Sequence, residues 1–90
     1  MSESFEWDED KNANNQQKHG VSFEEAQLAF ADPDRRILRD LDHSETEERW
    51  FCVGQVARGI LTVRFTYREN FIRIFGAGFW RQGKKRYEQK

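Results

Sequence analysis

The sequence predicts an α+β fold in which two N-terminal helices precede a four-stranded, largely antiparallel sheet and a short C-terminal helix. Three observations support this fold class. Residues that start and stop helices bracket two segments before Pro33, and beyond it apolar and polar residues alternate with the period of a strand. Residues 80–90 then favour a helix rich in cations. We expect the helices to cover one face of the sheet and to leave the other open to a ligand.

The first helix is expected at residues 8–20. Asp8 is placed to cap its N-terminus, and Gly20 is placed to adopt the left-handed conformation that ends a helix. The helix body has few large apolar residues, so we expect it to lie on the surface. Its packing contacts are expected from Phe5, Trp7 and Ala13.

The second helix is expected within residues 21–33. Ser22 and Glu25 have the spacing of a capping box, and Asp32-Pro33 ends the run. The buried stripe is expected from Phe23, Ala26 and Phe30.

Four strands are expected, near residues 35–41, 49–56, 60–67 and 71–76. Residues 57–59 and 68–70 supply turns, so the last three strands form an antiparallel meander. In the strand at 60–67, apolar residues alternate with Thr62, Arg64 and Thr66. One face of this strand is therefore apolar, and the other carries cations and hydroxyls.

The C-terminal helix is expected at residues 80–90, where Gly83 weakens it by ~1 kcal/mol relative to alanine. At 90 residues the chain has room for one small domain, spanning 1–90. The acidic N-terminus and the absence of a long apolar run predict a soluble, cytoplasmic protein without a membrane partner. With one cysteine, Cys52, and two histidines, no metal site is expected.

The net charge of −1 conceals two oppositely charged halves. Residues 1–48 hold 14 acidic and 5 basic side chains, a net −9, whereas residues 49–90 hold 2 acidic and 10 basic ones, a net +8. Such a division indicates either a surface for a polyanion or a charged partner, or a fold that pairs its two halves. Composition leaves both alternatives open.

No nucleophile elbow, phosphate-binding loop or metalloprotease motif is present. What remains is a set of cations suited to phosphate, with aromatic residues among them that can stack on unpaired bases. The cationic set is Lys11, Lys18, His19, Arg64, Arg68, Arg73, Arg81, Lys84, Lys85 and Arg86. The aromatic set is Phe71, Phe75, Phe79, Trp80 and Tyr87.

These groups suit a metal-free ribonuclease, which needs cations to hold the phosphate and groups that move protons. His19, next to Lys18, is a candidate for proton transfer; the alternative is that it only complements the helix dipole. His43 lies among carboxylates and is expected to make local hydrogen bonds within its loop.

Three segments resemble the BrnT family of type II toxins. FEWDEDKNANNQQKHGVSFEEA, from Phe5, matches the family's F-E-W-D-x-x-K-x-x-x-N-x-x-K-H-G-V-x-F-E-E-A opening. DHSETEERW is similar to its D-H-S segment through Ser44 and Arg49, and TYRENFIRI is similar to its T-x-R-x-x-x-I-R-I strand pair. The resemblance extends over residues 5–88.

The resemblance implies a RelE-like fold and an endoribonuclease that needs no metal or cofactor and inhibits translation by cleaving RNA. It implies neutralisation by a BrnA-like antitoxin, through which the toxin would reach operator DNA indirectly. A homo-oligomer is left open. Lys18, Arg68 and Arg73 would then hold the phosphate, His19 would transfer a proton, and Tyr87 would stack on a base or transfer a proton. Further RNA contacts are expected from Lys11, Arg64, Arg81, Lys84, Lys85 and Arg86.

The chain departs from the family at one point. Family members usually continue S-A-R-R-A-T after the last strand motif, whereas this chain has Gly76, Gly78 and Phe79 at the serine and two arginine positions. Arg81 is a candidate to replace one lost cation. The departure leaves open a catalytically degenerate homologue that binds antitoxin or RNA and shares in repression. A separate alternative is an RNA-binding module unrelated to toxins.

Overall fold

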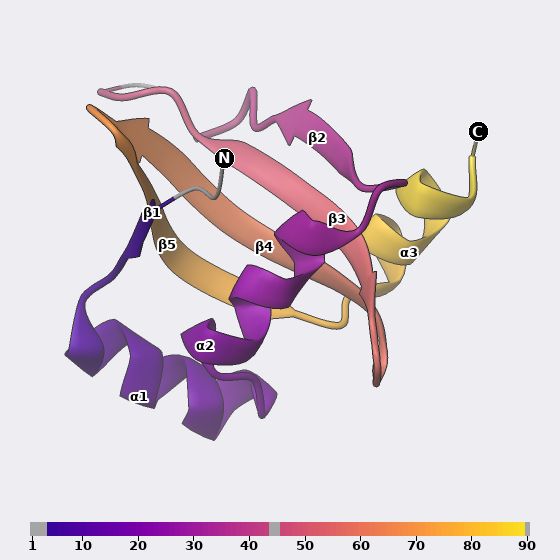
Figure 1. The fold of residues 1–90 in the computed structure, drawn as a ribbon, viewed down its shortest axis with the longest axis horizontal. Coiled ribbons are helices and arrows are strands. Elements are labelled where there is room, and N and C mark those ends of the chain that lie inside the picture. The colour runs from indigo at the N-terminus through magenta and orange to yellow at the C-terminus, as the bar shows by residue number, and fades with distance from the viewer. Residues whose placement is uncertain (1–3, 44–45, 90) are drawn as a thin grey trace.

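The computed structural model describes residues 4–43 and 46–89, and its helices and strands are built around one mixed sheet (Figure 1). In chain order the elements are β1 (Ser4–Glu6), α1 (Glu9–His19), α2 (Phe23–Ala26), the 3-10 helix η1 (Gln27–Ala31), β2 (Arg36–Arg39), β3 (Trp50–Val56), β4 (Gly59–Arg68), β5 (Phe71–Gly78) and α3 (Arg81–Glu88). The predicted α+β class is confirmed. Ser44 and Lys90, which belong to the matched loop and the expected last helix, lie outside the described residues.

The sheet has five strands in the order β1-β5-β4-β3-β2, so the expected number of four is wrong. The additional strand is β1, which runs parallel to β5 with Ser4 opposite Phe71 and Glu6 opposite Arg73. A three-residue strand is too short to show a period of two, and its partner lies at the other end of the sequence. The expected antiparallel meander of β3, β4 and β5 is confirmed, with β2 antiparallel to β3.

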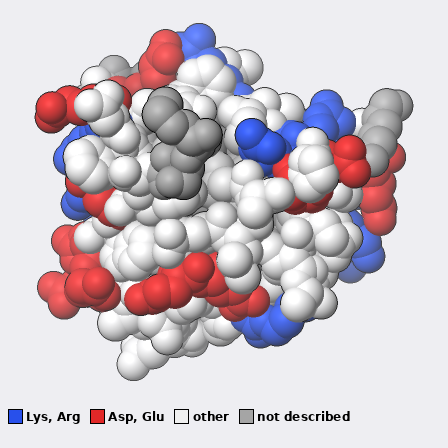
Figure 2. Space-filling view, viewed as in Figure 1, with Lys and Arg blue, Asp and Glu red and all other residues white. Residues whose placement is uncertain are grey.

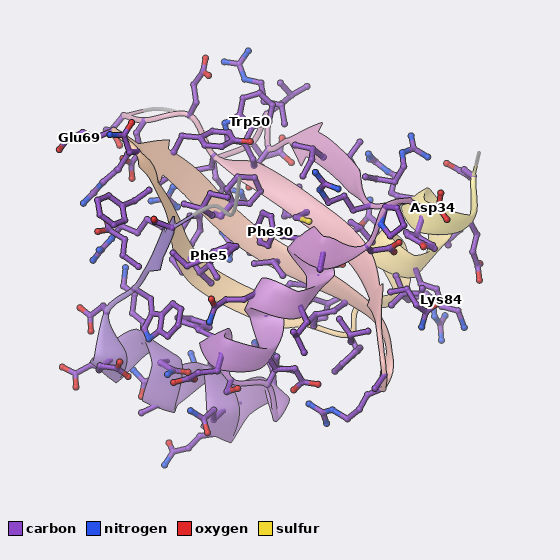
Figure 3. All side chains as sticks on the ribbon, viewed as in Figure 1. Phe5, Phe30, Asp34, Trp50, Glu69 and Lys84 are labelled. Carbon is purple, nitrogen blue, oxygen red and sulfur yellow. The ribbon has the colours of Figure 1, made fainter. Side chains whose placement is uncertain are left out.

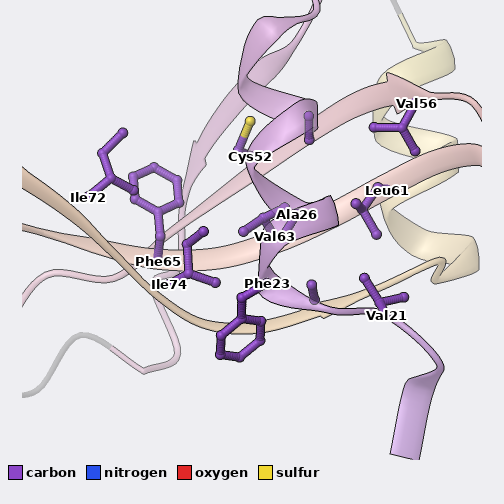
Figure 4. Packing of buried hydrophobic residues seen from close by; sticks show 12 residues of the cluster. Val21, Phe23, Ala26, Cys52, Val56, Leu61, Val63, Phe65, Ile72 and Ile74 are labelled. Carbon is purple, nitrogen blue, oxygen red and sulfur yellow. The ribbon is translucent and has the colours of Figure 1, made fainter. Parts of the chain in front are cut away.

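The hydrophobic core lies between one face of the sheet and the segment formed by α2 and η1 (Figures 1 and 4). Leu61 and Phe65 of β4 are completely buried there, together with Phe23 and Ala26 of α2. Phe30 packs against this cluster, its ring centroid 5.0 Å from that of Phe65. The expected helical stripe is thus confirmed, and burying each such large side chain stabilises the fold by about 1.5–3 kcal/mol.

Helix α1 packs through polar side chains rather than through alanine. Ala13 is exposed, which corrects the expectation that it packs inward, whereas Asn12 and Asn15 are buried. The Asn15 amide donates to the backbone oxygens of Val21 and Ala77, each at 2.9 Å, and accepts from the Ala77 N–H at 3.2 Å. Because buried polar groups are costly unless they are paired, this one amide joins α1 to β5.

The ends of both N-terminal helices follow the predicted local chemistry. The Asp8 carboxylate accepts from the backbone N–H of Asp10 at 2.8 Å, and Gly20 has a left-handed φ of 68°. The Ser22 hydroxyl accepts from the N–H of Glu25 at 3.0 Å. These contacts involve residues at most three positions apart and are therefore readable from sequence.

Helix α3 packs on the face of the sheet opposite the core, so the expectation that the helices share one face is wrong. Thr62, which alternates with the core residue Leu61 on β4, is buried beneath Gly83 of α3. A Cβ atom at Gly83 would collide with the Thr62 hydroxyl. The helix penalty expected from Gly83 is therefore offset by a close approach between helix and strand.

The charged side chains are unevenly distributed. On the face covered by α1 and α2, acidic groups gather over those helices, whereas basic groups lie around the edge of this face, several of them toward α3 (Figure 2). No helix in residues 4–43 and 46–89 is both long and apolar enough to cross a membrane.

Candidate nucleic-acid interface

The sheet face opposite the core carries a set of arginines and aromatic rings. Because Leu61 and Phe65 point into the core, alternation places Arg64 and Arg68 on the opposite face. The same rule places Phe71 and Arg73 there, and Arg49 joins them through its contact with Phe75. We call this set the arginine face: Arg49, Arg64, Arg68, Phe71, Arg73 and Phe75.

Two guanidinium groups converge on one ring at the centre of this face. The Arg49 and Arg64 guanidinium carbons lie 4.7 Å and 5.2 Å from the centroid of the Phe75 ring. A shift in the β4–β5 register between Arg64 and Phe65 places both Phe75 and Gly76 beside Arg64. Such a bulge re-aims side chains, and here it brings an aromatic ring to the arginines. All three side chains are half-buried, and within the described residues none of the ion pairs involves Arg64.

The other two arginines of the face have carboxylate partners. Arg73 donates to the Glu6 carboxylate of β1 at 3.2 Å, and Arg68 lies 3.6 Å from the Glu47 carboxylate. Both pairs are partly exposed, so each contributes only about 0–1 kcal/mol to stability.

Lys18 and His19 lie far from Arg68. The His19 ring meets the Trp80 ring at a centroid distance of 5.2 Å, and Trp80 lies beside Gly78, opposite Thr62 on β4. Arg68 lies six positions after Thr62 along β4, a span of ~20 Å. Glu69, next to Arg68, and Lys84 of α3 likewise stand at opposite ends of the sheet (Figure 3). Lys18 and His19 thus lie apart from the predicted catalytic residue Arg68.

Trp80 occupies the space that a side chain at position 78 would need. A Cβ atom at Gly78 would lie 2.5 Å from the Trp80 ring, well inside contact distance. At Gly76, by contrast, a Cβ atom would meet the Arg64 Cδ at 3.4 Å, an ordinary contact. Of these two positions, only position 78 has a neighbour that leaves no room for a side chain.

Arg81 does not lie beside Arg64. It lines a pocket of about 750 Å³ together with Lys84, Arg58 and Phe79, whereas Arg64 does not line that pocket. Arg58 donates to the Glu25 carboxylate at 2.6 Å, and this hydrogen bond holds the pKa of Glu25 below its usual value. Arg81 and Lys84 therefore extend a cationic edge near α3 rather than replace a cation at the centre of the arginine face.

Tyr87 joins α3 to the turn before β2. Its hydroxyl donates to the Asp32 carboxylate at 2.6 Å. That hydrogen bond, with burial and the negative charge of Asp32, raises the pKa of Tyr87 to about 12. A phenol with this pKa stays protonated near neutral pH.

The remaining predicted contacts are dispersed. Lys11 is exposed on α1, and Lys85 is exposed on α3. Arg86 lines a second pocket, of about 480 Å³, between α3 and strands β2 and β3.

A pair that the sequence analysis did not assign to the site lies on the rim of that second pocket. His43 Nδ1 is 3.1 Å from the Asp40 carboxylate, which confirms the expected local hydrogen bond. The spacing of three positions between Asp40 and His43 could have indicated this hydrogen bond. It could not have indicated that the pair lies beside a pocket. Among the described residues, no group of three histidine, cysteine or acidic side chains is arranged to hold a metal ion.

The fold and the arginine face define a small α+β protein with an exposed sheet surface suited to a phosphate backbone. The sequence matches, over residues 7–83, the family described as the ribonuclease toxin BrnT of type II toxin–antitoxin systems. The chain therefore belongs to the BrnT family of ribonuclease toxins, and its class implies an RNA substrate and an antitoxin partner.

A solved structure supports the same fold. The crystal structure of the ribonuclease toxin BrnT from Brucella abortus is similar with a TM-score of 0.66 and 17% sequence identity. The match covers 86% of this chain and 95% of that one. A comparison with curated protein sequences finds no match.

Proposed function

We propose that this BrnT-family chain is a metal-independent endoribonuclease whose centre is the arginine face. The observation that best supports this proposal is that the Arg49 and Arg64 guanidinium groups both lie over the Phe75 ring. Guanidinium groups gathered around one ring can hold a phosphate and stabilise the negative charge that it gains during cleavage.

The proposed reaction is transfer of the phosphodiester to its own ribose. The 2′-oxygen loses its proton and bonds to phosphorus, the bond from phosphorus to the 5′-oxygen breaks, and that oxygen takes up a proton. The products are a 2′,3′-cyclic phosphate and a free 5′-hydroxyl. Arg49 and Arg64 would stabilise the five-coordinate transition state, so their contribution is electrostatic.

We propose that the other predicted site residues contact further parts of the RNA. Arg68 and Arg73 would contact phosphates toward the β4–β5 turn, in exchange for Glu47 and Glu6. Lys18, His19, Arg81 and Lys84 lie toward the opposite end of the strands and would contact a neighbouring part of the same RNA. For Tyr87, the raised pKa favours a role as a hydrogen-bond donor over that of a base.

In the cell we propose that the chain acts in the cytoplasm as a single domain, inhibits translation by cleaving RNA, and is neutralised by a BrnA-like antitoxin. The toxin would reach operator DNA only through that antitoxin. The family assignment supports these roles.

Cleavage of a 5′-labelled RNA by the purified chain in EDTA tests the proposal. We expect Arg64→Ala to reduce cleavage by about 10²–10³-fold because it removes one charge-stabilising donor. Arg35→Ala is the matched control, since it removes an exposed cation at the turn before β2. Equal cleavage by wild type and Arg64→Ala would refute the assignment, and no cleavage by folded wild type would refute the activity.

A second candidate function follows from Gly78 and Trp80. Because the Trp80 ring fills the space of a side chain at 78, the chain has no cation where family members usually have arginine. A degenerate homologue that binds antitoxin and shares in repression would then copurify with the antitoxin and cleave no RNA. Full ribonuclease activity would eliminate this alternative.

A further inference from the structure

Asp40 and His43 form a carboxylate–histidine pair on the same sheet face as the arginines. Asp40 continues the β2–β3 ladder, because its N–H donates to the Arg49 oxygen at 2.8 Å. The two residues therefore lie opposite each other, and directly opposed side chains in antiparallel strands have Cβ atoms about 4.5–5.5 Å apart. Arg49 in turn shares the Phe75 ring with Arg64. The pair thus borders the centre of the arginine face.

The hydrogen bond determines which nitrogen of His43 can accept a proton. The Asp40 side chain is only 5% exposed. His43 Nδ1 lies 3.1 Å from Asp40 Oδ2 and 3.3 Å from Asp40 Oδ1. A carboxylate can only accept, so the neutral ring carries its proton on Nδ1 and presents Nε2 as the acceptor. The His43 side chain is 58% exposed, so this acceptor has access to a ligand.

Next to the pair is the pocket of about 480 Å³ between α3 and the sheet. Its volume lies in the range of small-ligand sites, about 300–1,000 Å³. Phe51 and Trp80 supply aromatic surface for a base, and Arg86 supplies a cation. Phe51 is also the cross-strand partner of Arg64, so the pocket and the arginine face are continuous.

From this arrangement we infer that His43 is the general base of the ribonuclease and that the adjacent pocket holds the nucleotide whose 2′-hydroxyl attacks. His43 Nε2 takes the 2′-proton, the 2′-oxygen bonds to phosphorus, and the 5′-oxygen leaves with a proton from solvent. Asp40 is a positioning residue that holds the tautomer and stabilises the imidazolium that forms. This inference rests on the proposed function.

The other proton-transfer candidates are less well placed. The Tyr87 hydroxyl is committed to Asp32 and has a pKa of about 12, and His19 meets the edge of the fold at Trp80 rather than the paired arginines. The charged groups that line the pocket with His43 are Asp40, Asp42, Arg39 and Arg86. Of the two histidines in the chain, His43 lines this pocket and His19 does not.

Single-turnover and steady-state cleavage of a short RNA by His43→Ala, with thermal unfolding as the folding control, tests the inference. We expect kcat to fall by about 10²–10⁴-fold with KM nearly unchanged, since general base catalysis contributes in this range. Added imidazole should restore part of kcat in His43→Ala, an effect that a purely structural role would not produce. As a single substitution, Asp40→Asn should lower kcat. In the His43→Ala background it should lower kcat little further, because the two residues act as a unit.

The outcomes separate this inference from the proposed function. If Arg64→Ala is inactive while His43→Ala retains kcat within about twofold of wild type, the base is not His43 and the ribonuclease proposal stands. Loss of kcat in His19→Ala with full activity in His43→Ala would move the role to His19. If folded wild type cleaves no RNA, both proposals fail together.

Discussion

The contact between Gly78 and Trp80 links two positions at which the chain differs from the usual family pattern. A Cβ atom at 78 would lie 2.5 Å from the Trp80 ring, so no side chain fits at position 78 unless the ring moves. The tryptophan therefore takes the place of the missing side chain and lines both pockets at this end of the sheet. A change at one of these positions has to be matched at the other.

We predict that Gly78→Ala destabilises the protein by about 1–3 kcal/mol, the usual cost of overpacking a well-packed site. The same substitution in a Trp80→Ala background should cost little, because the colliding ring is gone. Urea unfolding of the four proteins measures both effects. Gly76→Ala is the control, since its Cβ makes only an ordinary contact with Arg64. Equal destabilisation by Gly78→Ala in both backgrounds would contradict the prediction.

The roles of single residues were predicted correctly where they depend on contacts with neighbours in the sequence. Asp8, Gly20 and Ser22 cap helices as expected, because each contacts a backbone group within four residues. The role of Asn15 was not predictable, since its amide bonds to Ala77 at the far end of the chain. The Asp40–His43 bond is local and was expected, but its place beside Arg49 arises from strand pairing.

At the level of helices and strands, the ends of the chain were the hardest to predict. The strand β1 has three residues and is recruited by β5, and the place of α3 depends on contacts with β4 and on the Asp32 turn. Neither effect has a periodic signature in the sequence. By contrast, β3 to β5 have clear alternation and turns, so the meander was predicted with nearly correct ends.

The Tyr87–Asp32 bond holds α3 to the turn before β2 and should give the fold a pH-dependent contribution. The pKa of Tyr87 is about 12 in the folded protein and about 10 in the unfolded chain. The stabilising effect is therefore fully present below about pH 10 and is lost as the pH rises through about 12. We predict that the difference in unfolding free energy between wild type and Tyr87→Phe is constant up to pH 9 and shrinks above pH 10, in urea titrations at each pH.

Asp32→Asn is the control for this effect, because it removes the charge and keeps an oxygen acceptor. In the Asp32→Asn background, the effect of Tyr87→Phe on the unfolding free energy should begin to shrink at the same pH as in wild type. It should disappear at a lower pH than in wild type. A wild-type advantage that stays unchanged to pH 11.5 would show that the hydrogen bond does not perturb the phenol.

Across the whole molecule, part of the divided charge is paired between the two halves of the chain. Arg58 pairs with Glu25, Arg73 with Glu6 and Arg68 with Glu47, so the basic half does neutralise part of the acidic half. Arg64, at the centre of the exposed sheet face, takes no part in these pairs. The fold therefore gathers acidic groups over α1 and α2 and arginines on the opposite face of the sheet, an arrangement that the totals for each half could indicate but not locate.

This separation predicts how salt affects RNA binding. Each phosphate neutralised on single-stranded RNA contributes about −0.7 to the slope of log affinity against log salt concentration. We predict that Arg49→Ala and Arg64→Ala each reduce the magnitude of that slope by about 0.7, measured with a 2′-O-methyl oligonucleotide that resists cleavage. Arg35→Ala should leave the slope unchanged. Unaltered slopes in both arginine variants would place the RNA elsewhere on the molecule.

The buried thiol of Cys52 gives the protein an internal reporter. It is the one cysteine in the chain and is completely shielded within the core cluster on β3. A thiol-specific reagent can reach its sulfur only when the core around the central strands opens. The labelling rate therefore follows that opening. Antitoxin or RNA that stabilises the closed core would slow the modification, so binding could be detected without attaching a dye or altering a residue.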